Sequence, residues 1–367
     1  MSTRVLVVDD EAFFRRAISE ALSGLPGVEV VGTATNGKVA LSRLASLRPD
    51  LMTLDVEMPE MNGLETLEAM RNSGADTSVI MLSSRTVRGG EMTIRALESG
   101  AFDFITKPEG GSQKENLARL RDSLGSMIQA LARKREIRSI LHPKTPGSSA
   151  LPVSIPGIQQ QPIPASARPR SRSGPPIVLV GVSTGGPVAL AEFLPMLPAH
   201  LGAPIFIVQH MPPHFTEALA QRLQTKSAIQ VKEAQDSEIA QADCAYLAPG
   251  GKQMKLSPGQ QGEMIIRITE DPPENACRPS VDYLFRSVAL NFPGRSIAAI
   301  LTGMGNDGTE GMRLLKRGGS LNIAQNEASC VVFGMPREAI QAGVVDTVVP
   351  LNKLADTIVR AIAEARA

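Results

Sequence analysis

The sequence predicts two doubly wound α/β domains, each built on a mainly parallel sheet, joined by a proline-rich linker. Two observations and one general rule lead to the prediction of two α/β domains. At about 150 residues per domain, a chain of 367 residues has room for two or three domains. Short apolar strands alternate with amphipathic helical stretches at both ends of the chain. Short right-handed crossovers between successive strands then favour parallel sheets.

Five segments in the first 135 residues have the apolar composition of buried strands. They are residues 5–8, 28–32, 51–54, 79–82 and 102–105. Stretches between them, such as 13–22 and 64–70, carry apolar residues at helical spacing. In such sheets the functional residues gather at the carboxyl ends of the strands.

The tract over residues 143–176 breaks the pattern. It contains nine prolines, no acidic residue and no aromatic residue, which is typical of a semi-extended linker. We therefore expect a first domain over residues 1–125, a helix extension and linker over 126–176, and a second domain over 177–367. Basic residues lie before and inside the tract, and a solvated linker explains them better than a nucleic-acid arm.

The second domain repeats the α/β pattern, with some antiparallel pairing expected. The predicted strands are 177–182, 204–209, 245–247, 264–269 and 297–301. The predicted helices are 188–197, 216–223, 282–289 and 309–317.

Composition excludes several classes of function. A formal charge of +1 gives no bulk attraction to nucleic acid or anionic lipid, and 3% aromatics without Trp leave no stacking platform for single strands. The apolar runs are strand-sized, so we expect no membrane insertion. Three widely spaced cysteines fit a reduced, cytoplasmic protein without a disulfide scaffold.

Acidic, hydroxyl and basic side chains follow the predicted strands of the first domain. Asp9 and Asp10 follow the first strand, Asp55 the third, Ser83 the fourth and Lys107 the fifth. Neighbouring strand ends lie about 5 Å apart, so the three carboxylates can converge and hold Mg²⁺. Such a pocket suits capture of a phosphoryl group on a carboxylate. Each Asp could instead cap a helix or turn, but independent caps do not explain the serine and the lysine.

These residues belong to motifs that resemble the response-regulator receiver domain over nearly all of residues 1–125. The motifs are V-V-D-D-E at 7–11, D-V-E-M-P-E-M-N-G at 55–63, S-S at 83–84 and T-K-P at 106–108. The resemblance implies a flavodoxin-type fold with Asp55 as phosphoacceptor, and Mg²⁺ held by Asp9, Asp10 and Asp55. It also implies Ser83 as the switch hydroxyl and Lys107 as the phosphate-contacting lysine. Asn62 stands where the family usually has Asp.

In the second domain, Ser183 lies in a glycine-rich turn between an apolar strand and a helix. The turn can present a nucleophile or bind a phosphate group, and a plain glycine turn without chemistry is the simplest interpretation. The segment lacks the Walker pattern, which makes phosphate binding the weaker of the two functional interpretations. A serine nucleophile needs a base. Of the four histidines, only His210 ends a predicted strand, whereas His142, His200 and His214 lie in or beside proline-rich connections.

Asp307 follows another apolar strand, within T-G-M-G-N-D-G, and can orient the base, although such a loop is also a common turn. Its glycines leave N–H groups uncovered for an oxyanion. Asp282 is a rival carboxylate, placed less favourably in a predicted helix. G-V-S-T-G fits the α/β-hydrolase elbow, but the order Ser183, His210, Asp307 is not the Ser, acid, His order of that fold.

Residues 177–364 resemble the chemotaxis protein-glutamate methylesterase family. The motifs are G-V-S-T-G-G-P, V-Q-H-M-P-P, Y-L-A-P-G-G, R-P-S-V-D, L-T-G-M-G-N-D-G and F-G-M-P, in that order. The resemblance implies a Rossmann-like domain with Ser183 as nucleophile, His210 as general base, Asp307 as its orienting partner and the Met304 N–H in the oxyanion hole. No cofactor is expected in this esterase site.

The implied activity is phosphorylation-activated hydrolysis of glutamyl methyl esters on the cytoplasmic helices of methyl-accepting chemoreceptors. Deamidation of receptor glutamines is implied as well, with a chemotaxis histidine kinase as phosphodonor. The unphosphorylated first domain would cover the Ser183 cleft. The alternative is a response regulator whose output domain binds DNA or a protein partner without catalysis. DNA binding is disfavoured because the clustered basic residues lie in the linker and no helix-turn-helix pattern is present.

Overall fold

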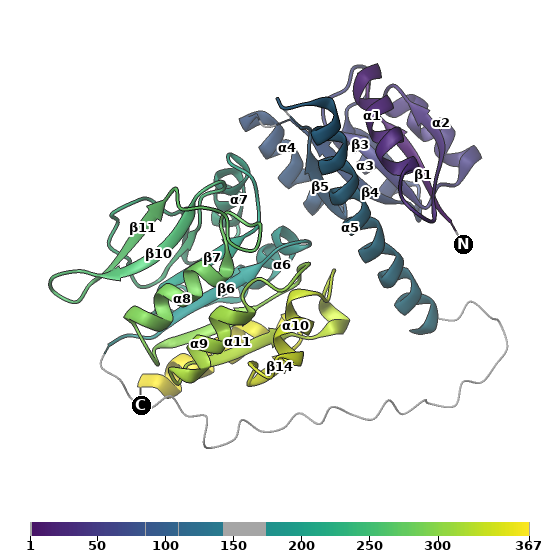
Figure 1. The fold of residues 1–367 in the computed structure, drawn as a ribbon. Coiled ribbons are helices and arrows are strands. Elements are labelled where there is room, and N and C mark those ends of the chain that lie inside the picture. Colours follow the sequence, from purple (N-terminus) through teal and green to yellow (C-terminus); the bar gives the residue numbers. More distant parts are fainter. Residues whose placement is uncertain (1, 85, 109, 142–173, 367) are drawn as a thin grey trace, which may run out of the picture.

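The computed structural model describes residues 2–84, 86–108, 110–141 and 174–366. Two α/β domains lie against each other, and the long helix α5 (Gln113–Leu141) runs from the first domain along the second (Figure 1). Most of the predicted linker lies outside the described residues. The expected boundary at residue 125 falls inside α5, which continues through it without a break.

The first domain has one five-stranded parallel sheet in the order β2-β1-β3-β4-β5. Its elements are β1 (Thr3–Val8), α1 (Ala12–Ser23), β2 (Val28–Ala34), α2 (Gly37–Leu47), β3 (Leu51–Asp55), α3 (Gly63–Asn72), β4 (Ser78–Ser83), α4 (Val87–Glu98), β5 (Asp103–Thr106) and α5. The central strands β1, β3 and β4 are mostly apolar and buried because helices cover both faces of the sheet. This arrangement confirms the predicted fold class.

Local side chains fix where several helices begin. Asn62 caps α3: its side chain accepts from the Glu65 N–H at 2.9 Å, and the Glu65 carboxylate accepts from the Asn62 N–H at 2.9 Å. Asn at this position therefore has a structural role away from the carboxylate cluster. Asn36 and Thr86 cap α2 and α4 through a single bond each, accepting from the N–H of Val39 and Gly89.

The second domain has a seven-stranded parallel sheet in the order β14-β13-β12-β6-β7-β9-β8. Its strands are β6 (Ile177–Val182), β7 (Ile205–Gln209), β8 (Gln230–Glu233), β9 (Cys244–Leu247), β12 (Ser296–Ile300), β13 (Leu321–Gln325) and β14 (Thr347–Val349). An antiparallel hairpin of β10 (Gln253–Pro258) and β11 (Met264–Thr269) is separate from this sheet. The expected antiparallel excursion is this hairpin.

Helices cover both faces of the larger sheet. They are α6 (Gly186–Phe193), α7 (Phe215–Gln224), α8 (Val281–Asn291), α9 (Thr309–Arg317), α10 (Met335–Gln341) and α11 (Leu351–Arg366), with the 3-10 turns η2 (Leu194–Met196) and η3 (Glu327–Ser329). One apolar layer joins α6, α7 and α11, and a second joins α8, α9 and α10 with the hairpin. The predicted helix over 188–197 is wrong at its end, because α6 stops at Phe193 and continues as the 3-10 turn.

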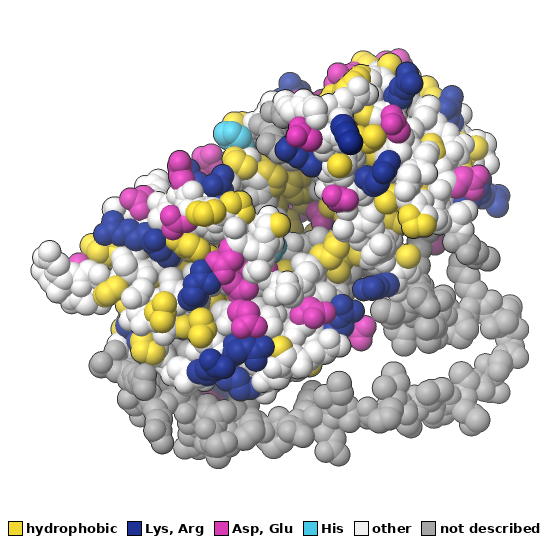
Figure 2. Space-filling view, viewed as in Figure 1, with side chains coloured by type: hydrophobic (Ala, Val, Ile, Leu, Met, Phe, Trp, Pro, Cys, Tyr) yellow, Lys and Arg dark blue, Asp and Glu magenta, His cyan; other side chains and the backbone are white. Residues whose placement is uncertain are grey.

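The two domains share an apolar interface. Phe104 of β5 stacks on the fully buried Phe215 of α7, with ring centroids 4.7 Å apart and planes inclined by 14°. Beside this pair, Glu98 of α4 forms ion pairs with Arg222 at 2.8 Å and Lys226 at 2.7 Å. Figure 2 shows hydrophobic side chains gathered in the hollow between the domains. The apolar core is therefore continuous across the boundary.

Among the described residues, no helix combines the length and apolarity that crossing a bilayer requires.

Candidate active site

Ser183 lies directly after β6, at the carboxyl edge of the larger sheet. Its N–H donates to the Thr302 carbonyl at 3.0 Å, and its own carbonyl accepts from the Gly186 N–H at 2.8 Å, which closes the turn into α6. Gly185 begins that helix with φ of 78°, a conformation that favours glycine. The turn therefore presents the Ser183 hydroxyl near a helix N-terminus, where anions are stabilised.

His210 and Asp307 meet although 97 positions separate them in the chain. His210 follows β7, the neighbour of β6, and its Nε2 lies 2.7 Å from Asp307 Oδ2. Ser183 and His210 line the same cavity. No side-chain hydrogen bond joins Ser183 to His210 in the described part of the chain, so the structure brings two of the three predicted groups into direct contact and the third close to them.

The carboxylate of Asp307 is held by an array of donors. Besides His210, it accepts from the Asn275 side-chain amide at 2.8 Å, the Ser280 hydroxyl at 2.9 Å, the Val281 N–H at 2.7 Å and the Asp282 N–H at 3.1 Å. Burial acts to raise the pKa of Asp307, but the bonds from His210, Asn275 and Val281 outweigh it and lower the pKa to about 2. Asp307 is therefore ionised and fixed in place.

An ionised Asp307 determines which nitrogen of His210 carries the proton. Because the carboxylate accepts, Nε2 donates, and Nδ1 is the nitrogen that has the lone pair for a base when the imidazole is neutral. The Cys277 sulfur lies 3.7 Å from Nδ1. Burial acts to lower the pKa of His210, whereas the contacts with Asp307 and Cys277 raise it to about 9.

Asp282, the rival carboxylate, has other partners. It accepts from the Gly311 N–H at 2.6 Å and from the Asn275 amide at 2.8 Å. Burial and the charge of Asp307 raise the pKa of Asp282 to about 6, against the bond from Gly311. Asp282 thus supports the loop around Asp307 and makes no hydrogen bond to His210 among the described residues.

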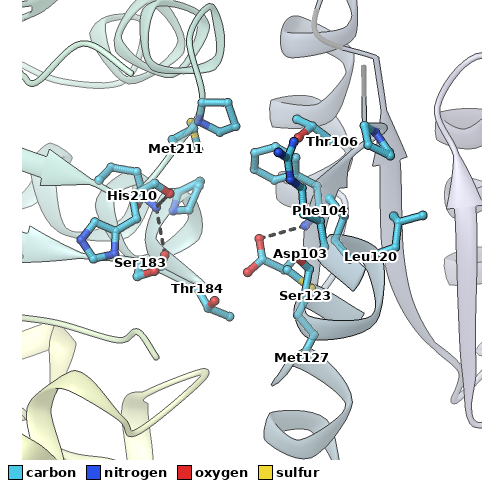
Figure 3. A pocket seen from close by; sticks show the side chains of 16 residues that line it. Asp103, Phe104, Thr106, Leu120, Ser123, Met127, Ser183, Thr184, His210 and Met211 are labelled. Carbon is cyan, nitrogen blue, oxygen red and sulfur yellow. Dashed lines mark hydrogen bonds between the residues drawn. The ribbon is translucent and has the colours of Figure 1, made fainter. Parts of the chain in front are cut away.

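Both domains line the cavity beside Ser183, which has a volume of about 380 Å³. From the second domain come Ser183, Thr184 and His210, and from the first come residues of β5 and α5 (Figure 3). The Asp103 carboxylate points across the gap toward Ser183 and Thr184 (Figure 3). Burial raises the pKa of Asp103 to about 6, opposed by the Phe104 N–H and the Thr184 hydroxyl. In this conformation residues of the first domain line the same cavity as the half-buried serine.

The loop after β12 packs directly against the serine turn. A Cβ built on Gly303 would lie 2.8 Å from Ser183 Cβ and 2.4 Å from Met335 Sδ, so only glycine fits there. Met304, the next residue, donates no backbone hydrogen bond among the described residues. Its N–H is thus free of backbone partners in a loop that contacts the serine turn, as an oxyanion donor requires.

The carboxylate cluster of the first domain forms a second polar site at the ends of β1 and β3. Lys107 Nζ lies 2.7 Å from Asp55 Oδ2 and 3.0 Å from Asp9 Oδ2. Burial raises the pKa of Asp55 to about 7 and also raises that of Asp9, while Lys107 opposes both shifts. Asp10 is exposed beside them.

The donor set fits a hard divalent cation. Ligand atoms of Asp9, Asp10 and Asp55 all lie within 4.8 Å of one another. Asp9 Oδ2 is buried and makes no hydrogen bond, although Lys107 is its ion-pair partner. Oxygen ligands and an under-satisfied carboxylate are what Mg²⁺ prefers. Ser83, at the end of β4, instead contacts α4: its hydroxyl accepts from Thr93 at 2.9 Å.

The fold and these two sites define a class: a receiver-type domain joined to an α/β domain with a serine-hydrolase arrangement. Comparison with known proteins makes the family explicit. The family described as CheB methylesterase matches residues 178–358, and the response regulator receiver domain matches residues 5–121. A protein-glutamate methylesterase/protein-glutamine glutaminase of Desulfotalea psychrophila is 48% identical over 98% of both chains.

Other relatives agree. The protein of the same name from Bacillus subtilis is 42% identical over 99% of both chains. The crystal structure of the Thermotoga maritima CheB methylesterase catalytic domain superposes with a TM-score of 0.50 at 40% identity, covering 51% of this chain and 99% of that one. The chain belongs to the protein-glutamate methylesterase family, with a receiver domain before the methylesterase domain. This membership argues against the alternative of a non-enzymatic output domain.

Sequence reasoning missed several residues of this site. Asn275, Ser280 and Cys277 contact Asp307 or His210, yet no predicted strand ends at any of them. The motif R-P-S-V-D includes Ser280, but only its last residue, Asp282, was considered for a role, as the rival carboxylate. Asp103 was missed because its partner Thr184 lies in the other domain.

Proposed function

We propose that this chain is a cytoplasmic, phosphorylation-gated serine hydrolase that cleaves glutamyl methyl esters on chemoreceptors. The observation that carries the proposal is the His210–Asp307 hydrogen bond of 2.7 Å at the cavity that Ser183 lines. An oriented imidazole beside a serine at a helix N-terminus is the arrangement that acyl transfer needs.

The reaction follows from these groups. The Ser183 oxygen attacks the ester carbonyl carbon while its proton passes to His210 Nδ1, and the Met304 N–H stabilises the oxyanion. The C–O bond to the methoxy group breaks, the imidazolium returns the proton, and methanol leaves. Water then attacks the acyl-serine by the same route and releases a receptor glutamate. With a glutamine substrate, ammonia leaves in place of methanol.

Asp307 acts by orientation. Its four other hydrogen-bond donors hold one oxygen against His210 Nε2, which leaves Nδ1 as the nitrogen that would accept the Ser183 proton. Ionised Asp307 also stabilises the imidazolium that forms during attack.

We further propose that phosphorylation of Asp55 opens the cavity. Asp9, Asp10 and Asp55 would hold Mg²⁺, which neutralises the charge of the incoming phosphoryl group when bound. Lys107 would contact the phosphoryl oxygens, and the Ser83 hydroxyl would change partner from α4 to the phosphoryl group. A chemotaxis histidine kinase would be the phosphodonor.

The proposed domain division is a receiver domain over residues 1–125, a helix extension and linker over 126–176, and a methylesterase domain over 177–367.

The deciding experiment is Ser183→Ala, measured as methanol release from methylated receptor membranes with Mg²⁺ and a small phosphodonor. We expect the rate to fall by about 10³-fold or more because the nucleophile is removed. Ser257→Ala, on the β10–β11 hairpin away from the cavity, is the matched control. A folded Ser183→Ala chain with a normal rate would refute the assignment.

A further inference from the structure

A thiol lies beside the proposed base, and the hydrolysis does not use it. Cys277 Sγ is 3.7 Å from His210 Nδ1, the nitrogen that faces away from Asp307. Ligand atoms of His210, Cys277 and Asp307 all lie within 4.8 Å of one another. Thiolate sulfur and imidazole nitrogen are the ligands that Zn²⁺ prefers.

The separation fits coordination to one ion. With Zn–S of about 2.3 Å and Zn–N of about 2.0–2.1 Å, a tetrahedral angle places sulfur and nitrogen about 3.6 Å apart. The 3.7 Å found between Cys277 Sγ and His210 Nδ1 therefore needs almost no rearrangement.

The surroundings hold both ligands in place. The Cys277 backbone exchanges two hydrogen bonds with Glu274, of 3.1 and 2.8 Å, across a tight turn. His210 Nε2 bonds to Asp307, which is the outer-shell carboxylate contact that fixes the ring of metal-binding histidines. Asp307 itself has its oxygens engaged by the five donors described above, so it supports the site without entering the coordination shell.

We propose that His210 Nδ1 and Cys277 Sγ form an inhibitory binding site for a thiophilic divalent cation, with Zn²⁺ as the ligand. Zn²⁺ binding displaces both the thiol proton and the proton that the imidazolium carries on Nδ1; both protons pass to solvent, and water completes the coordination shell. The exposed Ala276 and Arg278 on either side of the half-buried Cys277 leave a route for the ion from solvent. That this occupancy stops hydrolysis rests on the proposed function, in which Nδ1 accepts the Ser183 proton.

The first test measures metal binding by a signal that does not depend on esterase activity. The full-length chain is titrated with Co²⁺ while the near-ultraviolet thiolate-to-cobalt charge-transfer absorption is followed. Carboxylates of the Mg²⁺ site cannot produce that absorption, so it reports a cysteine ligand alone. We expect it in the wild type and in Cys330→Ser, and its loss in Cys277→Ser and His210→Gln. Cys330 is the matched control because it is also half-buried and unpaired in this domain, and burial raises the pKa of its thiol to about 12.

The second test measures methanol release against Zn²⁺ concentration, each variant relative to its own metal-free rate. Cys277→Ser should need at least about tenfold more Zn²⁺ for half-inhibition than wild type and Cys330→Ser, and EDTA should restore activity. Equal inhibition of Cys277→Ser and wild type, or no charge-transfer absorption in the wild type, would overturn the proposal. A chain that shows the absorption but hydrolyses no ester would keep the metal site and refute the proposed function instead.

Discussion

Phe104→Ala is the sharpest test of gating by the receiver domain. Phe104 is half-buried, and its ring lies against Phe215 with centroids 4.7 Å apart. In an open conformation the ring would face water, so its removal weakens closure while sparing the receiver core. We therefore expect a higher rate of methanol release without phosphodonor.

The size of the effect follows from the contact. A stacked aromatic pair contributes about 0.5–1.5 kcal/mol beyond burial, and burying about half of a Phe side chain adds about 1 kcal/mol. A total of about 2 kcal/mol shifts the closed-to-open ratio about 30-fold. The basal rate should rise by up to that factor, and activation by phosphodonor should shrink correspondingly.

The assay compares the basal methanol-release rate of Phe104→Ala with two references. Phe13→Ala on α1 is the control, since Phe13 is 62% exposed and lies away from the interface. A chain lacking residues 1–140 gives the ceiling for a fully uncovered site. If Phe104→Ala folds, accepts phosphate and keeps the resting rate, occlusion by this contact is wrong.

Three further predictions concern the histidine and its carboxylate. Asp307→Asn should lower kcat by about 10⁴-fold, because an amide cannot accept from all five donors and no longer fixes the proton on His210 Nε2. The control Asp282→Asn should lower kcat much less, and equal losses of kcat in the two variants would contradict the role of Asp307. With the pKa of His210 at about 9, the base is protonated at neutral pH, so kcat/KM of the resting chain should rise with pH through about 9. The raised pKa of His210 also stabilises the folded chain; this contribution is complete below about pH 6.5 and is lost as the pH rises through about 9. Denaturant unfolding of the wild type and of His210→Gln at several pH values measures it. A difference in unfolding free energy that does not change with pH would refute the pKa shift.

The apolar pattern predicted much of the fold because strands buried on both faces are mainly apolar. β6 and β11 were predicted with the bounds that the structure has. The weaker elements were missed: β8 is a short edge strand with Lys232 and Glu233 in its sequence, and β14 has only three residues. The missed strand β13 is fully buried but contains Asn322, whose amide donates to two backbone carbonyls.

The sequence by itself determined which side chains follow the strands, because parallel strands end at one edge of a sheet whatever the details of packing. Ser183, His210 and Asp307 were found in that way, as were Asp9, Asp55 and Lys107. Only the tertiary structure decided which nitrogen of His210 faces Asp307, and that Cys277 lies beside the other one. It alone placed Asp103 opposite Ser183. Such contacts depend on the rotation of one ring and the docking of one domain, which no pattern of neighbouring residues encodes.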